Sequence, residues 1–189
     1  MIKQIIALTG PIRAGKSLVL GLLEEKGYKG YKFSNAINKE IKRRGKKIER
    51  KLQQDIGDEL RKKFGGDYWA KEILKIAEND KSELVVIDGV RNPCEVKYLR
   101  DRGALMIGID ADYKIRKIRF FANSKPSDPK NEKDFDKIDR RDRGIDEEDF
   151  GQQVTKSLEL SDVVIINNWD SVDLLKKAFT KLLKKHKVI

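Results

Sequence analysis

Cysteine and histidine are nearly absent from this sequence, and long hydrophobic runs are missing. Cys94 is the single cysteine and His186 the single histidine among 189 residues. One cysteine excludes a disulfide framework, and one histidine argues against a zinc site and against a Ser-His-Asp triad. Neither a secretory signal nor an apolar span of roughly 18 residues is apparent. We therefore expect a cytoplasmic protein without membrane contact, folded as one domain.

Positive charge, by contrast, is plentiful, with a formal net charge of +11. Residues 36–51 carry eight Lys/Arg against two Glu. This basic block could contact nucleic-acid phosphates or form one wall of a site for anionic substrates. It holds no aromatic residue between Ile37 and Lys51, so a base-stacking platform is missing there. Nucleic acid therefore stays open as a partner, but it is the less favoured of the two.

The stretch G-P-I-R-A-G-K-S, from Gly10 to Ser17, fits the phosphate-binding pattern G-x-x-x-x-G-K-[ST] at every fixed position. Gly10 and Gly15 allow positive φ, so that successive main-chain N–H groups can converge on a phosphate. Lys16 would bring positive charge to the β- and γ-phosphates, and the Ser17 hydroxyl would ligate Mg²⁺. An apolar run at 2–8 and a helical repeat after the motif supply the flanking strand and helix. We therefore predict that ATP contacts Gly10, Pro11, Ile12, Arg13, Ala14, Gly15, Lys16, Ser17 and Leu18.

Four more apolar runs alternate with helical segments along the chain. The predicted strands are residues 31–33, 84–88, 104–109 and 163–166. This alternation predicts a three-layer α/β/α fold with a five-stranded parallel sheet and ligands at the carboxyl ends of the strands. The predicted core comprises 1–33, 82–122 and 160–189, with a helical acceptor-binding insertion at 34–81 and a lid region at 123–150.

Within the lid, residues 123–147 combine Pro126, Pro129 and dense charge of both signs with few apolar residues. This composition predicts a mobile surface loop rather than core. Its arginines could swing onto the transferring phosphates when the lid closes. The alternative for any one of them is an exposed ion pair of little energetic value. We expect at least one to act in transfer and assign this role to Arg140 and Arg141.

Acceptor and metal contacts are predicted from the strand ends and the insertion. Asp88 closes a β-branched run and is expected to contact Mg²⁺, unless it only caps the following turn. Arg91 could grip an acceptor phosphate in two hydrogen bonds and act in transfer, or lie at the surface. Gln53, Gly57 and Arg61 step by four along one helix face, which could form the acceptor pocket. Ser34 lies at the end of the second strand, where it could cap the next helix. Trp69 could stack on a base or pack in the core.

Three stretches resemble the nucleoside monophosphate kinase superfamily, and within it the phage-type deoxynucleoside monophosphate kinases. F-S-N-A-I-N-K-E-I-K (Phe33 to Lys42) resembles that family's motif after strand two. L-Q-Q-D-I-G-D-E-L-R-K-K-F-G-G-D-Y-W (Leu52 to Trp69) resembles its Gln–Gly–Arg–Trp helix pair. I-D-G-V-R-N-P-C-E-V (Ile87 to Val96) resembles the end of its third strand. The resemblance implies acceptor binding by Ser34, Gln53, Gly57, Arg61, Trp69, Asp88 and Arg91.

The last third also resembles dephospho-CoA kinase, through S-D-V-V-I-I-N-N (Ser161 to Asn168) and Gln152-Gln153 upstream. Asn167 and Asn168 could face the adenine edge. That family's acidic residue after strand two is missing here, where the chain has Ser34-Asn35. An acceptor phosphate is already ionised and needs no general base, so this absence favours a monophosphate acceptor.

The predicted activity is therefore transfer of the γ-phosphoryl group from ATP, with Mg²⁺, to a nucleoside or deoxynucleoside monophosphate. Dephospho-CoA is the alternative acceptor, and a nucleotide-gated nucleic-acid-binding ATPase is the alternative of another class. No N-K-x-D guanine signature occurs, which disfavours a GTPase.

Overall fold

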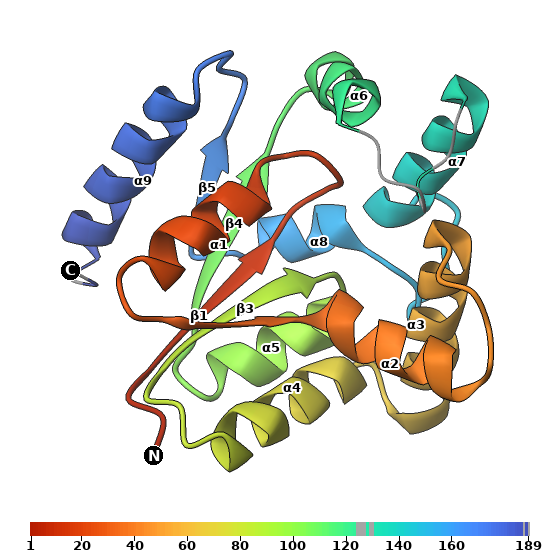
Figure 1. Ribbon diagram of the computed structural model, residues 1–189, viewed down its shortest axis with the longest axis horizontal. Coiled ribbons are helices and arrows are strands. Elements are labelled where there is room, and N and C mark those ends of the chain that lie inside the picture. Colours follow the sequence, from red (N-terminus) through yellow and green to blue (C-terminus); the bar gives the residue numbers. More distant parts are fainter. Residues whose placement is uncertain (124–127, 129–130, 187, 189) are drawn as a thin grey trace.

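The computed structural model describes residues 1–123, 128, 131–186 and 188, which form helices around one parallel sheet (Figure 1). In chain order the elements are β1 (Gln4–Thr9), α1 (Lys16–Glu24), β2 (Lys29–Lys32), α2 (Phe33–Arg43), α3 (Arg50–Phe64), α4 (Tyr68–Asn79), β3 (Leu84–Val90), α5 (Pro93–Arg100), β4 (Leu105–Asp110), α6 (Tyr113–Ala122), α7 (Glu132–Arg143), α8 (Val154–Glu159), β5 (Val163–Ile166) and α9 (Val172–Lys185). The strand order is β2-β3-β1-β4-β5, and all neighbours are parallel. The predicted three-layer α/β/α fold with a five-stranded parallel sheet is confirmed.

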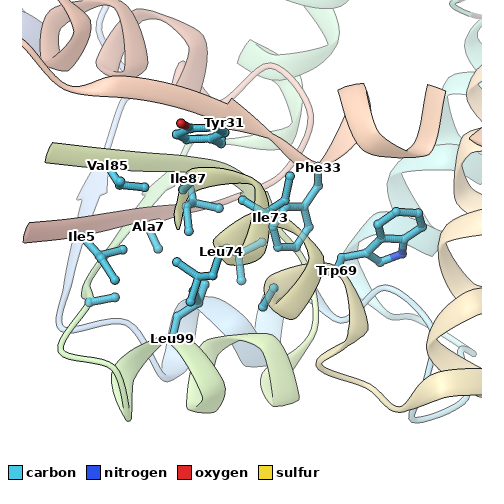
Figure 2. Packing of buried hydrophobic residues seen from close by; sticks show 14 of the residues in the cluster. Ile5, Ala7, Tyr31, Phe33, Trp69, Ile73, Leu74, Val85, Ile87 and Leu99 are labelled. Atoms are coloured by element: carbon cyan, nitrogen blue, oxygen red, sulfur yellow. The ribbon is translucent and has the colours of Figure 1, made fainter. Parts of the chain in front are cut away.

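Helices cover both faces of this sheet because its central strands are apolar on both sides. On one face Ile6 and Leu8 of β1 belong to a buried cluster that includes residues of α1 and α9. On the opposite face Ile5 and Ala7 join a second cluster with side chains such as Trp69 of α4 (Figure 2). None of the helices described combines the length and the apolarity that crossing a bilayer requires.

The predicted helical insertion consists of α2, α3 and α4, between β2 and β3. Each helix buries an apolar stripe at helical spacing, for example Ile37 and Ile41 in α2. The N-cap residue of α2 is Lys32, so Ser34 lies within the first turn of the helix. The capping role predicted for Ser34 is therefore wrong, because the helix begins directly at the strand end.

The lid differs from its prediction as a surface loop over 123–147. This interval contains α7, whose Phe135 is fully buried with its ring centroid 4.7 Å from that of Phe120 in α6. The loop prediction is wrong because one aromatic anchor and several ion pairs hold this charged helix in place. Pro126 and Pro129 lie outside the described residues. The short helix α8 was not predicted either.

Candidate functional site

The phosphate loop connects β1 to α1 and has the geometry that its motif predicts. Gly10 and Gly15 have φ angles of 142° and 115°, which L side chains rarely adopt. A Cβ atom at Gly10 would lie only 1.9 Å from the carbonyl oxygen of Ile109, so a side chain does not fit there. The helix α1 begins at Lys16, and the N–H groups and positive dipole end of its first turn favour an anion at the loop.

Lys16 is folded back over this loop. Its residue is 9% exposed, and its Nζ donates hydrogen bonds to the carbonyl oxygens of Gly10 at 2.6 Å and Pro11 at 2.8 Å. Burial, followed by repulsion from Arg91, lowers the pKa of Lys16 to about 7, while Asp88 opposes this shift. A bound triphosphate would restore the charged state by adding negative charge beside the ammonium group.

A cavity of about 360 Å³ opens beside Lys16 at the carboxyl ends of β2 and β3. Residues of the phosphate loop, of α2 and α3 in the insertion, and of α7 in the lid line it together. Cations outnumber carboxylates in its wall: the cations are Arg13, Lys16, Lys32, Arg50, Arg61 and Arg91, and the carboxylates are Asp88 and Asp142. An anionic ligand therefore fits the electrostatics of this cavity.

Asp88 lies near the end of β3 and lines the cavity, as predicted for a metal-contacting carboxylate. Its Oδ1 atom is buried and has no hydrogen-bond partner among the described residues. A buried carboxylate oxygen without a donor is costly, and a cation or a cation-bound water would satisfy it. Nowhere in the described part of the chain do three or more His, Cys, Asp or Glu side chains gather as ligands for a metal. A metal at Asp88 would therefore depend on ligands outside such a cluster, which suits Mg²⁺ shared with nucleotide phosphates.

Two arginines predicted for the acceptor, Arg91 and Arg61, do meet in the cavity wall. Arg91 donates to Asp142 of the lid, and burial together with the nearby Arg50 lowers its pKa to about 10. Arg61 is 1% exposed and its Nε donates to Glu95 at 2.7 Å. The second oxygen of Glu95 accepts from the main-chain N–H of Arg91 at 2.8 Å. Glu95 thus connects the two guanidinium-bearing residues and holds their relative position.

The cavity wall also contains uncharged polar side chains. Gln53 Nε2 donates to Asn38 Oδ1 at 2.7 Å, and Gln54 Nε2 donates to Gln152 Oε1 at 3.1 Å. All four carboxamides line the cavity, together with the apolar residues Ile37, Ile48 and Ile138. The sequence prediction included Gln53 but missed Asn38, Gln54 and the role of Gln152, because no motif marks a carboxamide supplied from a distant segment.

Several predicted residues are not brought to the cavity. Trp69 is buried in the core beside α3, and its Nε1 donates to the carbonyl oxygen of Gly57 at 3.1 Å, so neither residue lines the acceptor pocket. Arg140 pairs with Asp146 at 2.8 Å, both largely exposed. Arg141 points away as well, into a second cavity of about 320 Å³. The transfer role assigned to the two lid arginines has no support in this arrangement.

The asparagines after β5 take separate places. Asn167 Nδ2 donates a hydrogen bond to the carbonyl oxygen of Ala14 in the phosphate loop at 2.7 Å. Asn168 Oδ1 accepts from the main-chain N–H of Asp112 at 2.8 Å. The Asn167 side chain therefore stabilises the phosphate loop by bonding to the loop's main chain. The Asn168 side chain instead bonds to the main chain of the connection between β4 and α6.

Comparison with known sequences places the chain beside proteins whose names state no activity. No protein-family model matches it. It is 28% identical over 186 residues to a UPF0200 protein of Thermoplasma volcanium, covering 97% of this chain and 98% of that protein. A UPF0200 protein of Methanopyrus kandleri is 27% identical over 174 residues, covering 87% and 81%. The similarity spans almost the whole length of the chain, including insertion and lid.

Comparison with solved structures identifies the fold. Shikimate kinase from Aquifex aeolicus superposes with a TM-score of 0.55 at 18% identity, covering 97% of this chain and 98% of that one. Shikimate kinase from Bacteroides thetaiotaomicron gives 0.59 at 13% identity, with 97% and 98% covered. The Thermus thermophilus protein TT1252 gives 0.61 at 19% identity, with 98% of each chain covered. The chain thus has the fold of the P-loop kinases.

Proposed function

We propose that this protein is an ATP- and Mg²⁺-dependent phosphotransferase that moves the γ-phosphoryl group of ATP to a nucleoside or deoxynucleoside monophosphate. The observation that carries the proposal is the cavity beside the phosphate loop, where Lys16 and the acceptor-side cations Arg50, Arg61 and Arg91 line one space. A second anion held there would lie next to the terminal phosphate of a nucleotide on the loop.

The uncharged residues of the cavity wall support a nucleotide as acceptor. Carboxamides there, such as Gln53 and Gln54, offer both donors and acceptors, and Ile37 and Ile138 offer apolar contact. A nucleobase combines a flat apolar face with a hydrogen-bonding edge, whereas its phosphate is dianionic. The cavity therefore offers cations for a phosphate together with uncharged polar and apolar groups for a base, a combination that suits a nucleoside monophosphate.

In the proposed reaction an oxygen of the acceptor phosphate attacks the γ-phosphorus, and the bond to the β–γ bridging oxygen breaks to release ADP. Lys16 stabilises the negative charge on the γ-phosphoryl group and on the leaving phosphate. Arg91, held by Glu95, orients the acceptor phosphate and offsets its repulsion from the triphosphate. No general base is needed because the attacking oxygen is already ionised.

Mg²⁺ would be held by the Ser17 hydroxyl at the start of α1 and by Asp88, directly or through water. The unpartnered Oδ1 of Asp88, judged among the described residues, is what makes this assignment fit. When bound, the ion supplies charge neutralisation for the β- and γ-phosphates. Asp88 in turn helps keep Lys16 charged, because its carboxylate raises the pKa of that ammonium group.

A nucleotide-gated nucleic-acid-binding ATPase is the less supported alternative. In the basic block of residues 36–51, Arg43 and Arg44 both pair with Glu40, and Arg44 also pairs with Glu59 at 2.7 Å. Arg50 faces the cavity rather than the outside. The block is thus partly neutralised, and part of it serves as the wall of a small-molecule site.

The deciding experiment measures ADP release from ATP and Mg²⁺ with a panel of acceptors. The panel holds the ribo- and deoxyribonucleoside monophosphates, dephospho-CoA, and shikimate, with which the structurally similar shikimate kinase from Acinetobacter baumannii forms a complex. We expect stimulation above hydrolysis by a monophosphate, with matching loss of that acceptor. If only shikimate or dephospho-CoA stimulated ADP release, that compound would replace the nucleoside monophosphate as the proposed acceptor. Stimulation of ATP hydrolysis by RNA or DNA, without phosphoryl transfer, would support the nucleic-acid-binding ATPase.

A further inference from the structure

The lid places a carboxylate directly on the phosphate-binding machinery. Asp142 of α7 is 2% exposed. Its Oδ2 accepts a hydrogen bond from the main-chain N–H of Ile12, within the phosphate loop, at 2.9 Å, and its Oδ1 accepts from the guanidinium of Arg91. One carboxylate therefore joins a loop amide to the arginine expected to hold an acceptor phosphate.

These two donors are the kind that phosphate oxygens use. A main-chain N–H of a phosphate loop and a planar guanidinium both bind oxyanions, and a phosphate held between them would compete with the Asp142 carboxylate for the same donors. With Asp142 in place, the negative charge beside Arg91 is supplied by the protein itself. The carboxylate thus stands where an oxygen of a bound phosphate would have to be.

The rest of α7 holds Asp142 at this point. Arg141 donates to Asp55 at 2.5 Å and to Asp58 at 2.7 Å in α3, and Arg143 donates to both oxygens of Asp110 at 2.9 and 2.7 Å. Both arginine side chains are about one-fifth exposed, at 23% and 20%. Ion pairs that water can reach are weak enough to exchange, so the C-terminal turn of α7, which carries Asp142, can release its hold on the cavity. Asp139, one turn earlier, stays held by its buried pair with Arg116, whose side chain is 1% exposed.

We propose that Asp142 is an internal anion that fills the subsite formed by the Ile12 N–H and Arg91, and that an incoming phosphate displaces it and with it the C-terminal turn of α7. Naming that phosphate as the acceptor's rests on the proposed function, whereas the displacement itself does not. The ligand-free protein then keeps its transfer site covered, and phosphate binding at the subsite opens the lid.

The first test measures inorganic phosphate binding by calorimetry in the wild type and in Asp142→Asn. The substitution keeps the shape of the side chain but removes its charge from Arg91, so we expect affinity to rise about tenfold or more. Asp146→Asn is the matched control, because it removes a lid carboxylate whose side chain is 82% exposed and should leave affinity unchanged. The gain should vanish in the double variant Asp142→Asn, Arg91→Gln. An unchanged or weaker affinity in Asp142→Asn would overturn the proposal.

The second test uses the wild-type protein, so it does not depend on the folding of a variant. Amide hydrogen exchange over residues 132–143 is compared with and without saturating inorganic phosphate. Displacement of Asp142 predicts faster exchange in α7 when phosphate is bound, and equal or slower exchange contradicts it. If these results hold while no acceptor stimulates ADP release, the anion subsite stands and the kinase proposal falls. If an acceptor stimulates ADP release but amide exchange in α7 does not rise, the kinase proposal stands and the displacement of Asp142 is refuted.

Discussion

The phosphate loop and the lid helix α7 meet at Asp142, yet different forces hold them in place. The loop is fixed by its own main chain: Gly10 has no room for a side chain, and Lys16 bonds to two loop carbonyls. The helix α7 has Phe135 as its one buried hydrophobic side chain and is otherwise attached by charge. The ion pairs that join it to other helices and strands include Arg91–Asp142, Arg116–Asp139, Lys117–Glu132, Arg141–Asp55, Arg141–Asp58 and Arg143–Asp110.

This difference separates a permanent binding site from a cover that can leave it. Main-chain geometry and close packing resist displacement, because each shift costs hydrogen bonds and van der Waals contact. Partly exposed ion pairs such as Arg141–Asp58 and Arg143–Asp110 exchange with water and weaken with salt, whereas the Arg116–Asp139 pair is buried and anchors the middle of the helix. The loop should therefore keep its conformation with or without a ligand, and the lid should respond to ligand charge.

The largest expected effect concerns the loop. Lys16→Ala removes the cation that contacts the carbonyls of Gly10 and Pro11 and is proposed to reach the nucleotide phosphates, and turnover should fall by roughly a thousandfold. The measurement is acceptor-dependent ADP release, with circular dichroism to verify folding. Lys181→Ala on the exposed face of α9 is the control and should behave as wild type. Near-normal turnover in Lys16→Ala would show that the loop does not act on the reacting phosphates.

The next effect concerns stability beneath the acceptor cavity. Arg61→Ala would leave the buried Glu95 without its partner at 2.7 Å, both side chains being at most 1% exposed. Removing one member of a buried pair costs about 3–5 kcal/mol, so the urea midpoint should fall strongly. Arg43→Ala, whose side chain is 74% exposed, removes the same charge from a surface pair and should change stability little. Equal losses for both variants would contradict this account.

A pH effect follows from Lys16. Its pKa is lowered to about 7 in the free protein, so the ammonium form is lost as pH rises above 7. A bound triphosphate favours that form and raises the pKa, and binding at pH 8 should therefore take up close to one proton. Calorimetry of ATP binding in buffers of different ionisation enthalpy measures this uptake. Affinity should decline by up to about tenfold for each pH unit above 7. Release of a proton on ATP binding at pH 8, or no net proton uptake, would be incompatible with a Lys16 pKa near 7.

The lid should loosen by a smaller amount when an ion pair is removed. Arg143→Gln breaks the two hydrogen bonds to Asp110, which join α7 to the end of β4. We expect a local loss of about 1 kcal/mol, seen as faster amide exchange in 132–143 with unchanged exchange in β1 and β3. Added salt should reduce the difference between this variant and wild type. A matching increase in the central strands would mean that lid and sheet open as one unit.

The smallest effect is expected for Arg140. Its pair with Asp146 has side chains 58% and 82% exposed and lies outside the cavity wall. Arg140→Gln should change stability by less than about 0.5 kcal/mol and leave turnover within twofold of wild type. A large loss of turnover with unchanged stability would restore Arg140 to the catalytic role that its sequence position suggested.

Local sequence determined the phosphate loop, the alternation of strands and helices along the chain, and most of the helices. The phosphate loop is encoded by eight consecutive residues. Asp88 could be located because it directly follows the apolar residues of its strand. Such features are predictable because main-chain geometry and hydrophobic periodicity act over a few residues. The acceptor-side position of Arg91 and Arg61 could be anticipated for the same reason, each lying on a recognisable strand end or helix face.

Only the tertiary structure decided which distant side chains complete the cavity. Asp142, Gln54 and Gln152 come from segments far apart in the chain, and the sequence assigned none of them to the cavity. Trp69 is the opposite case, a residue that the sequence offered for base stacking or for core packing. The structure places it in the core against α3, where it bonds to the carbonyl oxygen of Gly57. Charge is the least local of these forces. A run of mixed charges such as 132–143 specifies a helix and its partners only when Asp55, Asp58 and Asp110 are brought opposite its arginines.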